Sequence, residues 1–396
     1  MAGRGGGRSG IQRLLMAVSA LLVVLGLLSV TSVAYGVYRV RRVPQVALTG
    51  VLVPRTPPPP SQPGQERVAD VPPSPPFNVL LVGDSSRAFV RGGDDRRSFG
   101  DDEGAGSDSI VLVRIDPGAG TAATLPFPRD LYVELADGSG TMRINKAYEL
   151  GGARLLIETI QARFDLPINH YAQVDFAGFR ELIDAVGGIT IDLAAPVRDF
   201  DRSPASFGRN QSGLDIPDAG CVELDGDQAL AYVRSRHVEQ LIDGRWVADG
   251  RSDFARSERL QQLLRQVLAK SLADGLLSPG RVLDLLEVAD ESISLSDDLD
   301  ADEITDLALD LRRISPDAFT DFALPVADLV TPEGAQVLEL LPAEAAPILD
   351  VFRGIAPVPA PTTTVPADVP GLRPPPTSPT TVPSTLPATV PPPPLC

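Results

Sequence analysis

Runs of apolar residues divide the middle of the chain into predicted strands and helices. Short β-branched runs bounded by Gly, Asp or Pro predict strands, at residues 78–83, 109–116, 121–127, 131–135, 168–174, 189–193 and 319–326. Apolar positions at helical spacing predict helices at 153–164, 175–186, 225–234, 253–271, 281–291 and 302–313. Because helices alternate with strands, the pattern predicts an α/β fold with a central mixed β-sheet and helices on both faces.

An uncharged apolar run, residues 14–38, precedes this pattern. A helix of that length measures roughly 37 Å, which exceeds a hydrocarbon core of about 30 Å. The run predicts one transmembrane helix, and the alternative is a cleaved signal peptide, since Ser32-Val33-Ala34 fits a small-x-small cleavage site. Arginines flank the run on both sides, so the positive-inside rule does not fix its orientation.

Proline-rich segments border the predicted domain. Residues 39–76 contain RTPPPPSQPG and VPPSPP and predict an extended spacer, whereas the end of the chain alternates Pro with Thr, Ser and Val and predicts disorder. The predicted organisation is a cytoplasmic N-terminus at 1–13, the membrane helix at 14–38, the linker at 39–76, a folded domain at 77–275, a helical part at 276–355 and a disordered tail at 356–396.

Composition narrows the possible partners. The formal net charge is -17, and affinity for DNA or RNA needs cations that neutralise phosphates. The composition therefore predicts no nucleic-acid partner. Cys221 and Cys396 are the only cysteines, too few for a disulfide framework or a zinc cluster, and we expect Cys221 to be buried and inert.

Arginine and aspartate residues gather beside the predicted strands. The five clusters are Asp108, Arg129 with Asp130, Arg143 with Asn145 and Lys146, Arg234 with Arg236, and Asp253 with Arg256 and Arg259. One such pair on a surface is usually a solvated ion pair worth under about 1 kcal/mol. Five clusters in one domain predict a site for a multiply charged oxyanion, where guanidinium groups bind phosphate oxygens and paired carboxylates hold a divalent cation.

Seven stretches, in this order, resemble the LytR-CpsA-Psr family of membrane-anchored enzymes that attach glycopolymers to bacterial peptidoglycan. They are NVLLVGDSSR, SDSIVLVRIDP, PRDLYV, RINKAYELGG, VDFAGFRELIDAVGGITIDL, CVELDGDQALAYVRSRH and DFARSERLQQ. The resemblance implies that 77–275 is a catalytic domain, a phosphotransferase that moves a glycan from polyprenyl pyrophosphate to peptidoglycan. It also implies a single-pass protein of the cell membrane whose C-terminal domain is extracytoplasmic.

The resemblance further implies roles for individual residues. Family arginines that grip the pyrophosphate match Arg129, Arg234, Arg236 and Arg256, and the supporting cations are Arg87 and Arg259. Asp108 matches one of two family aspartates that hold magnesium, or manganese in its place, and Asp84 is the candidate for the second. With Asp130 as a candidate general base, the expected catalytic residues are Arg129, Asp130, Arg234, Arg236 and Arg256. His237 is a second candidate base, with a plain hydrogen-bonding role as the alternative.

Three positions depart from the family pattern. Asp84 comes one residue early and leaves Ser85 in the usual place of the aspartate, Gly106 replaces an arginine, and Leu260 is inserted before a glutamine pair. In an extended chain, a shift of one residue reverses the direction of the side chain. The alternative function is therefore a degenerate, non-catalytic adaptor that binds the cell wall or a glycopolymer.

Overall fold

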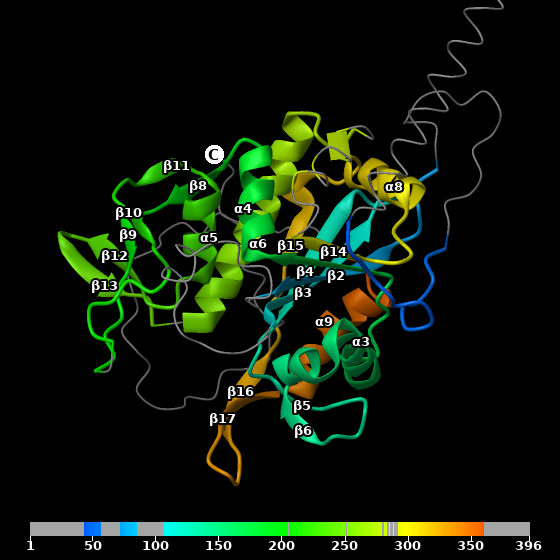
Figure 1. Cartoon of the computed structure of the whole chain (residues 1–396), viewed down its shortest axis with the longest axis horizontal. Coiled ribbons are helices and arrows are strands. Elements are labelled where there is room, and N and C mark those ends of the chain that lie inside the picture. The colour runs from blue at the N-terminus through cyan, green and yellow to red at the C-terminus, as the bar shows by residue number, and fades with distance from the viewer. Residues whose placement is uncertain are drawn as a thin grey trace, which may run out of the picture.

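A central sheet of seven strands organises the protein (Figure 1). The structure is a computed structural model that describes residues 43–56, 72–84, 107–204, 206–250, 252–278, 281, 282, 285, 288 and 292–359. The strands lie in the order β1 (Gln45–Val46), β14 (Ile293–Ser296), β7 (His170–Asp175), β2 (Phe77–Asp84), β3 (Ser107–Asp116), β4 (Thr121–Phe127) and β15 (Phe319–Asp321). The neighbours of β2 are antiparallel β3 and parallel β7. The predicted central mixed sheet is thus confirmed.

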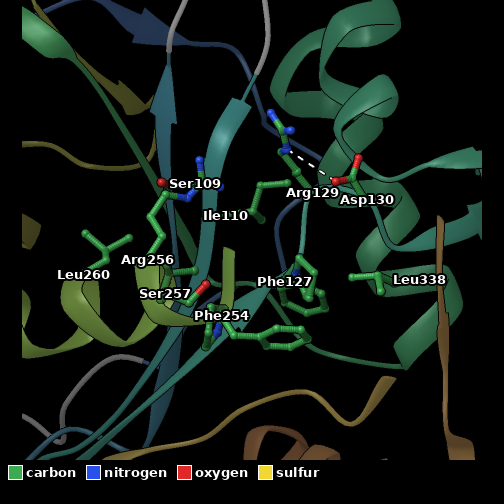
Figure 2. A pocket seen from close by; sticks show the side chains of 13 residues that line it. Ser109, Ile110, Phe127, Arg129, Asp130, Phe254, Arg256, Ser257, Leu260 and Leu338 are labelled. Atoms are coloured by element: carbon green, nitrogen blue, oxygen red, sulfur yellow. Dashed lines mark ion pairs between the residues drawn. The ribbon is translucent and has the colours of Figure 1, made fainter. Parts of the chain in front are cut away.

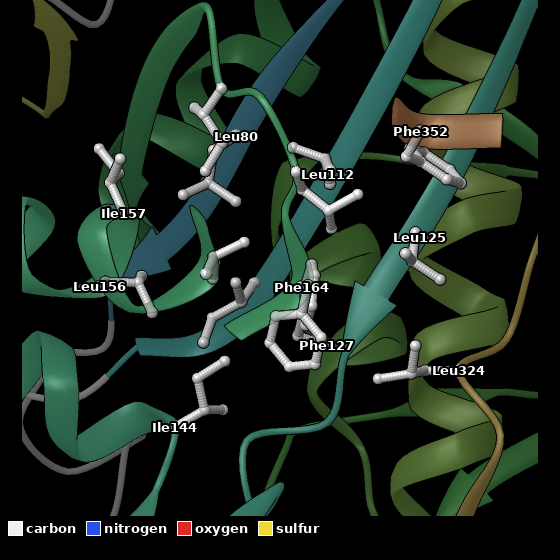
Figure 3. Packing of buried hydrophobic residues seen from close by; sticks show 14 of the residues in the cluster. Leu80, Leu112, Leu125, Phe127, Ile144, Leu156, Ile157, Phe164, Leu324 and Phe352 are labelled. Atoms are coloured by element: carbon white, nitrogen blue, oxygen red, sulfur yellow. The ribbon is translucent and has the colours of Figure 1, made fainter. Parts of the chain in front are cut away.

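Helices cover both faces of this sheet, as the alternation of side chains along its strands requires. Leu80, Leu112 and Leu125 face α3 (Asn145–Phe164) and α9 (Pro342–Arg353), in a buried cluster with Leu156 and Phe352 (Figure 3). The alternate positions of the same strands pack against α6 (Ser252–Ala273) and α8 (Ala301–Leu311). The fold is therefore a three-layer α/β domain.

A smaller unit lies beside the central sheet, on the left of Figure 1. It contains a four-stranded sheet in the order β10 (Asp215–Ile216), β9 (Val197–Asp199), β12 (Val238–Ile242) and β13 (Arg245–Ala248). The strand pair β8 (Ile189–Leu193) and β11 (Gly220–Leu224) and the helices α4 (Phe176–Ala185) and α5 (Gly226–Arg234) share its buried core. Two further strand pairs are β5 (Tyr132–Glu134) with β6 (Thr141–Arg143) and β16 (Val326–Val330) with β17 (Gln336–Leu340).

The region predicted as a separate helical part, 276–355, belongs to the same fold. Its strand β14 pairs with β7, and its strand β15 pairs with β4. Helix α8 confirms the predicted helix at 302–313, whereas most of 281–291 lies outside the described residues. Strand β15 lies within the predicted strand at 319–326. The prediction missed β14, because its four residues are too few for a clear alternating pattern.

The prediction of an extended spacer at 39–76 was wrong for residues 43–56. Strand β1 pairs with β14, and Leu48 is fully buried in the main core. Arg55 lies 4.2 Å above the Phe77 ring and 2.5 Å from Glu303. The prediction gave weight to the prolines of 39–76 and overlooked the apolar residues of 43–56, which bury surface on folding.

Leu48→Ala is expected to lower the free energy of unfolding by about 2–5 kcal/mol, because it leaves a cavity in a packed core. The matched control is Val53→Ala, since Val53 is 40% exposed on the same segment and surface changes stay within about 0.5 kcal/mol. Urea denaturation of the full chain measures both. Equal stability of the two variants would mean that 43–56 is detached from the core.

The outermost predictions fall largely outside the described residues. These are the cytoplasmic N-terminus at 1–13, the membrane helix at 14–38 and the tail beyond residue 359. Within the described part of the chain, no helix is long and apolar enough to span a membrane. The first residues of the predicted tail are packed, since Val358 is buried and the Pro359 carbonyl accepts a hydrogen bond from Thr320 Oγ1 at 3.1 Å.

Candidate active site

The candidate site lies at one end of the central sheet, where β2 ends, β3 begins and β4 ends. Because β2 and β4 both run antiparallel to β3, these three strand ends meet at the same edge. A pocket opens here (Figure 2), and the side chains drawn include Ser109, Ile110, Phe127, Arg129, Asp130, Phe254, Arg256, Ser257, Leu260 and Leu338. Segments more than 200 residues apart in the sequence therefore form one pocket.

The pocket combines apolar and charged side chains. Ile110, Phe127, Leu260 and Leu338 supply apolar surface, whereas Arg129 and Arg256 supply guanidinium groups. Such a lining suits a ligand with an apolar portion and an anionic portion, because guanidinium groups bind phosphate oxygens in pairs of hydrogen bonds.

Arg129 stands on the loop that follows β4. A backbone hydrogen bond of 3.0 Å from Leu131 to Pro128 closes a turn around it. Asp130 holds the neighbouring charges in place, with Oδ2 at 3.5 Å from Arg129 Nε and Oδ1 at 3.0 Å from Arg143 Nε. The loop thus presents Arg129 to the pocket together with one carboxylate.

The other predicted arginines come from α5 and α6. Arg256 is buried near the start of α6 and lines the pocket. Arg234 ends α5 and lies 4.3 Å above the ring of Phe176, which begins α4 directly after β7. The structure thus brings Arg129 and Arg256 into one pocket, whereas Arg234 and Arg236 lie at the end of α5, outside the described lining of that pocket.

Arg259 binds backbone carbonyls at the end of α5. Its side chain is buried and donates through Nε to the Tyr232 carbonyl at 2.8 Å and through Nη2 to the Ser235 carbonyl. A cation there also suits the negative end of the α5 dipole. Arg259 therefore supports the turn that carries Arg234 and Arg236, and its contact with pyrophosphate stays a prediction.

We expect Arg259→Lys to lower the free energy of unfolding by about 1–3 kcal/mol, because one ammonium group leaves a buried carbonyl without its donor. Thermal unfolding of the full chain measures the change, with Arg209→Lys at an exposed position as the control. A variant as stable as the wild type that binds pyrophosphate more weakly would restore a ligand role for Arg259.

Asp84 and Asp108 lie on adjoining strands at this edge of the sheet. Gly83 pairs with Ser109 but Asp84 pairs with Ser107, so Asp108 is the extra residue of a β-bulge. Asp84 continues the Leu80 face of β2, toward α3, and is 4% exposed. Its Oδ2 accepts hydrogen bonds from Tyr148 Oη at 3.1 Å and from Gln173 Nε2 at 2.8 Å.

Two carboxylates stand at this edge of the sheet, because Asp175 pairs with Asp84 between β7 and β2. Burial raises the pKa of the Asp175 carboxyl, with the Asp84 charge acting in the same direction, and Asp175 Oδ1 accepts a hydrogen bond from Gly178 at the start of α4. Carboxylate oxygens are the ligands that Mg²⁺ prefers. Among the described side chains, which exclude that of Asp108, no three His, Cys, Asp or Glu residues group closely enough to hold a metal ion.

Several predicted residues are not among the described side chains that line the pocket. Arg87, Ser85 and Gly106 lie outside the described residues. His237 lies beside two carboxylates of the smaller unit, with Nδ1 at 3.7 Å from Asp199 and Nε2 at 3.9 Å from Asp201, and it is not part of the described lining of the pocket.

The prediction for Cys221 was wrong. The residue is exposed on β11. The error arose because the absence of a nearby helix N-terminus or His partner in the sequence concerns the reactivity of a thiol, and it carries no information about burial.

Sequence reasoning missed the apolar half of the pocket. Phe127, Phe254 and Leu338 resemble core residues in the sequence, and only the folded chain brings them together. It also missed Tyr148 and Gln173, which contact Asp84 from α3 and β7. The available signal for Tyr148 was its place in the RINKAYELGG stretch.

The fold and the site define a class of α/β domain that holds an apolar pocket with arginines at the end of a central mixed sheet. A profile of the LytR_cpsA_psr family matches residues 61–349. The chain therefore belongs to the LytR-CpsA-Psr family.

Two curated relatives carry the name polyisoprenyl-teichoic acid-peptidoglycan teichoic acid transferase TagU. The one from Enterococcus faecalis is 30% identical over 237 residues, which make up 60% of this chain and 66% of the relative. The one from Bacillus cereus is 32% identical over 199 residues, 50% of this chain and 53% of the relative. The chain thus spans between about half and two-thirds of the length of these relatives.

Solved structures share the fold. A Streptococcus agalactiae protein has a TM-score of 0.56 at 22% identity and covers 71% of this chain and 87% of its own. The LytR-Csp2A-Psr enzyme from Actinomyces oris has a TM-score of 0.53 at 24% identity, with 78% and 96% covered. TagT bound to LI-WTA has a TM-score of 0.53 at 20% identity, with 76% and 98% covered.

Proposed function

We propose that this protein is a phosphotransferase that attaches a polyprenyl-pyrophosphate-linked glycopolymer to peptidoglycan during cell-wall assembly. The observation that carries the proposal is the pocket itself, with apolar side chains beside Arg129 and Arg256. The names of the curated relatives support this substrate class, since those enzymes are transferases between polyisoprenyl-linked teichoic acid and peptidoglycan.

The proposed reaction is one phosphoryl transfer. A sugar hydroxyl of peptidoglycan attacks the phosphorus nearer the glycan and forms a P–O bond, and the bond from this phosphorus to the bridging oxygen breaks. Polyprenyl phosphate leaves with that oxygen and its electron pair, and the hydroxyl proton passes to a carboxylate, for which Asp130 is the candidate. Such transfer depends mainly on positioning and charge stabilisation.

The arginines supply most of this charge stabilisation in the proposal. Arg129 and Arg256 bind pyrophosphate oxygens at the pocket, and Asp130 keeps Arg129 oriented through their contact. Arg234 lies above Phe176, directly after the end of β7, and Arg236 follows two residues later in the chain; in the proposal both add positive charge. Guanidinium groups suit this task because they remain charged and bind phosphate oxygens in a fixed geometry.

Asp84 and Asp108 are the residues that would hold magnesium. When bound, the cation adds positive charge near the pyrophosphate oxygens. We further propose that residues 14–38 anchor the chain in the cell membrane and that the folded domain is extracytoplasmic, where peptidoglycan lies. The apolar length of this run supports the anchor.

A second candidate function is a non-catalytic adaptor that binds the lipid-linked polymer without transferring it. The orientation of Asp84 favours it, because this carboxylate is turned toward α3, where Tyr148 and Gln173 contact it. Arg256 reaches the pocket from α6, which covers the other face of the sheet.

One assay separates the two functions. The full chain is mixed with a polyprenyl-pyrophosphate glycan, a peptidoglycan glycan and Mg²⁺, and polyprenyl phosphate is quantified by chromatography. The transferase releases it with multiple turnovers. A preparation that binds the lipid and releases none would be the adaptor.

A further inference from the structure

We infer that Tyr148 and Gln173 are positioning residues that hold the Asp84 carboxylate in one orientation at the active end of the sheet. This inference rests on the proposed function, in which Asp84 helps to hold a cation. It gives a role to two side chains, Tyr148 and Gln173, that do not line the pocket of Arg129 and Arg256.

The Asp84 carboxylate is fixed by two donors from different elements. Tyr148 comes from α3 and Gln173 from β7, and both donate to Oδ2. A carboxylate oxygen can only accept, so the Tyr148 hydroxyl is the donor in its contact with Asp84. With Oδ2 bound on two sides, rotation of the carboxylate breaks at least one hydrogen bond.

A third residue fixes the amide of Gln173. The hydroxyl of Tyr171, which is fully buried, donates to Gln173 Oε1 at 2.8 Å. Since the amide oxygen accepts this bond, the amide nitrogen must face Asp84. The chain of contacts therefore runs from Tyr171 through Gln173 and Asp84 to Tyr148.

The backbone of α3 places Tyr148 over the end of β2. Gly152 interrupts the helix with φ 62° and ψ -156°, so the first turns, which carry Tyr148, have a direction of their own. The positive φ favours glycine at this position, because other residues rarely adopt it. A Cβ at Gly152 would meet no atom within 4 Å, so the backbone conformation, and not a lack of space, is what disfavours a side chain there. The kink thus helps to position the first turns of α3, from which Tyr148 contacts Asp84.

A ligand-orienting role explains why this network lies where it does. Each member of this network has a hydrogen bond, and a satisfied polar network makes the groups that it joins rigid. Residues that orient a metal-binding carboxylate typically contribute 10–100-fold to metal affinity. The network contacts the one predicted ligand whose place in the chain departs from the family pattern.

Titration of the full chain with Mn²⁺ by calorimetry tests the inference. We expect Tyr148→Phe to raise the Kd for Mn²⁺ about 10-fold or more, because it removes one hydrogen bond and keeps the ring. Tyr232→Phe is the matched control, since Tyr232 donates to Gln262 at 3.0 Å, away from Asp84, and we expect its Kd to equal the wild-type value. In the Asp84→Asn background, Tyr148→Phe should have no further effect.

Two results would overturn the inference. One is a wild-type Kd for Tyr148→Phe, and the other is an equal effect of Tyr148→Phe with and without Asp84→Asn. The transfer assay separates this failure from that of the proposed function. If the wild type releases polyprenyl phosphate while Tyr148→Phe keeps the wild-type Kd for Mn²⁺, only the positioning role fails. If Tyr148→Phe raises this Kd but the wild type releases no polyprenyl phosphate, only the transferase function fails.

Discussion

Arg256→Ala is expected to lower the rate of polyprenyl phosphate release about 100-fold or more, as the loss of one preorganised charge-stabilising group does in other enzymes. Arg256 is 8% exposed and lines the pocket beside Ser257 and Leu260. Its charge acts there with little screening by water, so it contributes more than a surface arginine would. Single-turnover kinetics with the lipid-linked glycan measure the effect on the chemical step.

Arg209→Ala is the control for Arg256→Ala, because Arg209 is exposed in the smaller unit. It removes the same charge from the chain and should leave the rate unchanged. Equal rates for the two variants would show that Arg256 does not act on the pyrophosphate. A circular dichroism spectrum of each variant verifies that the fold is retained.

Asp108→Asn is expected to abolish magnesium-dependent release, with a decrease of about 100-fold or more, since the amide keeps the size of the side chain and loses its charge. Asp108 is the bulged residue of β3, which has no partner on β2, and it lies between the residues that pair with Gly83 and Asp84. Rates measured across a range of Mg²⁺ concentrations distinguish weaker binding of the cation from a slower reaction.

Asp116→Asn is the control for Asp108→Asn, because Asp116 lies at the opposite end of the same strand. We expect wild-type rates from it at every Mg²⁺ concentration. Should Asp108→Asn also keep the wild-type rate, the ligand assignment implied by the resemblance is wrong.

The periodicity of the chain predicted the central sheet well because β2 and β3 are long and rich in β-branched residues. The sequence motifs also led to Arg129 and Arg256, which the structure brings into one pocket. Both successes depend on local signals, namely alternation along a strand and charged residues next to strand ends.

The rest depended on contacts between distant segments. Leu48 joins the main core and Leu338 reaches the pocket from β17, and no local pattern reveals either contact. Arg259 resembled a phosphate ligand in the sequence, and no local pattern shows that it also donates to the carbonyls of Tyr232 and Ser235. The direction of the Asp84 side chain could not be predicted without the position of α3, whose first turns lie before the kink at Gly152.

The most direct measurement is the mass of the acceptor after reaction. The full chain is incubated with a polyprenyl-pyrophosphate glycan, a defined peptidoglycan fragment and Mg²⁺, and the fragment is analysed by mass spectrometry. We predict that the fragment gains the glycan with one phosphate, while the lipid appears as polyprenyl monophosphate. An unmodified fragment, in a sample in which the chain has bound the lipid, would contradict the transferase function and leave the adaptor.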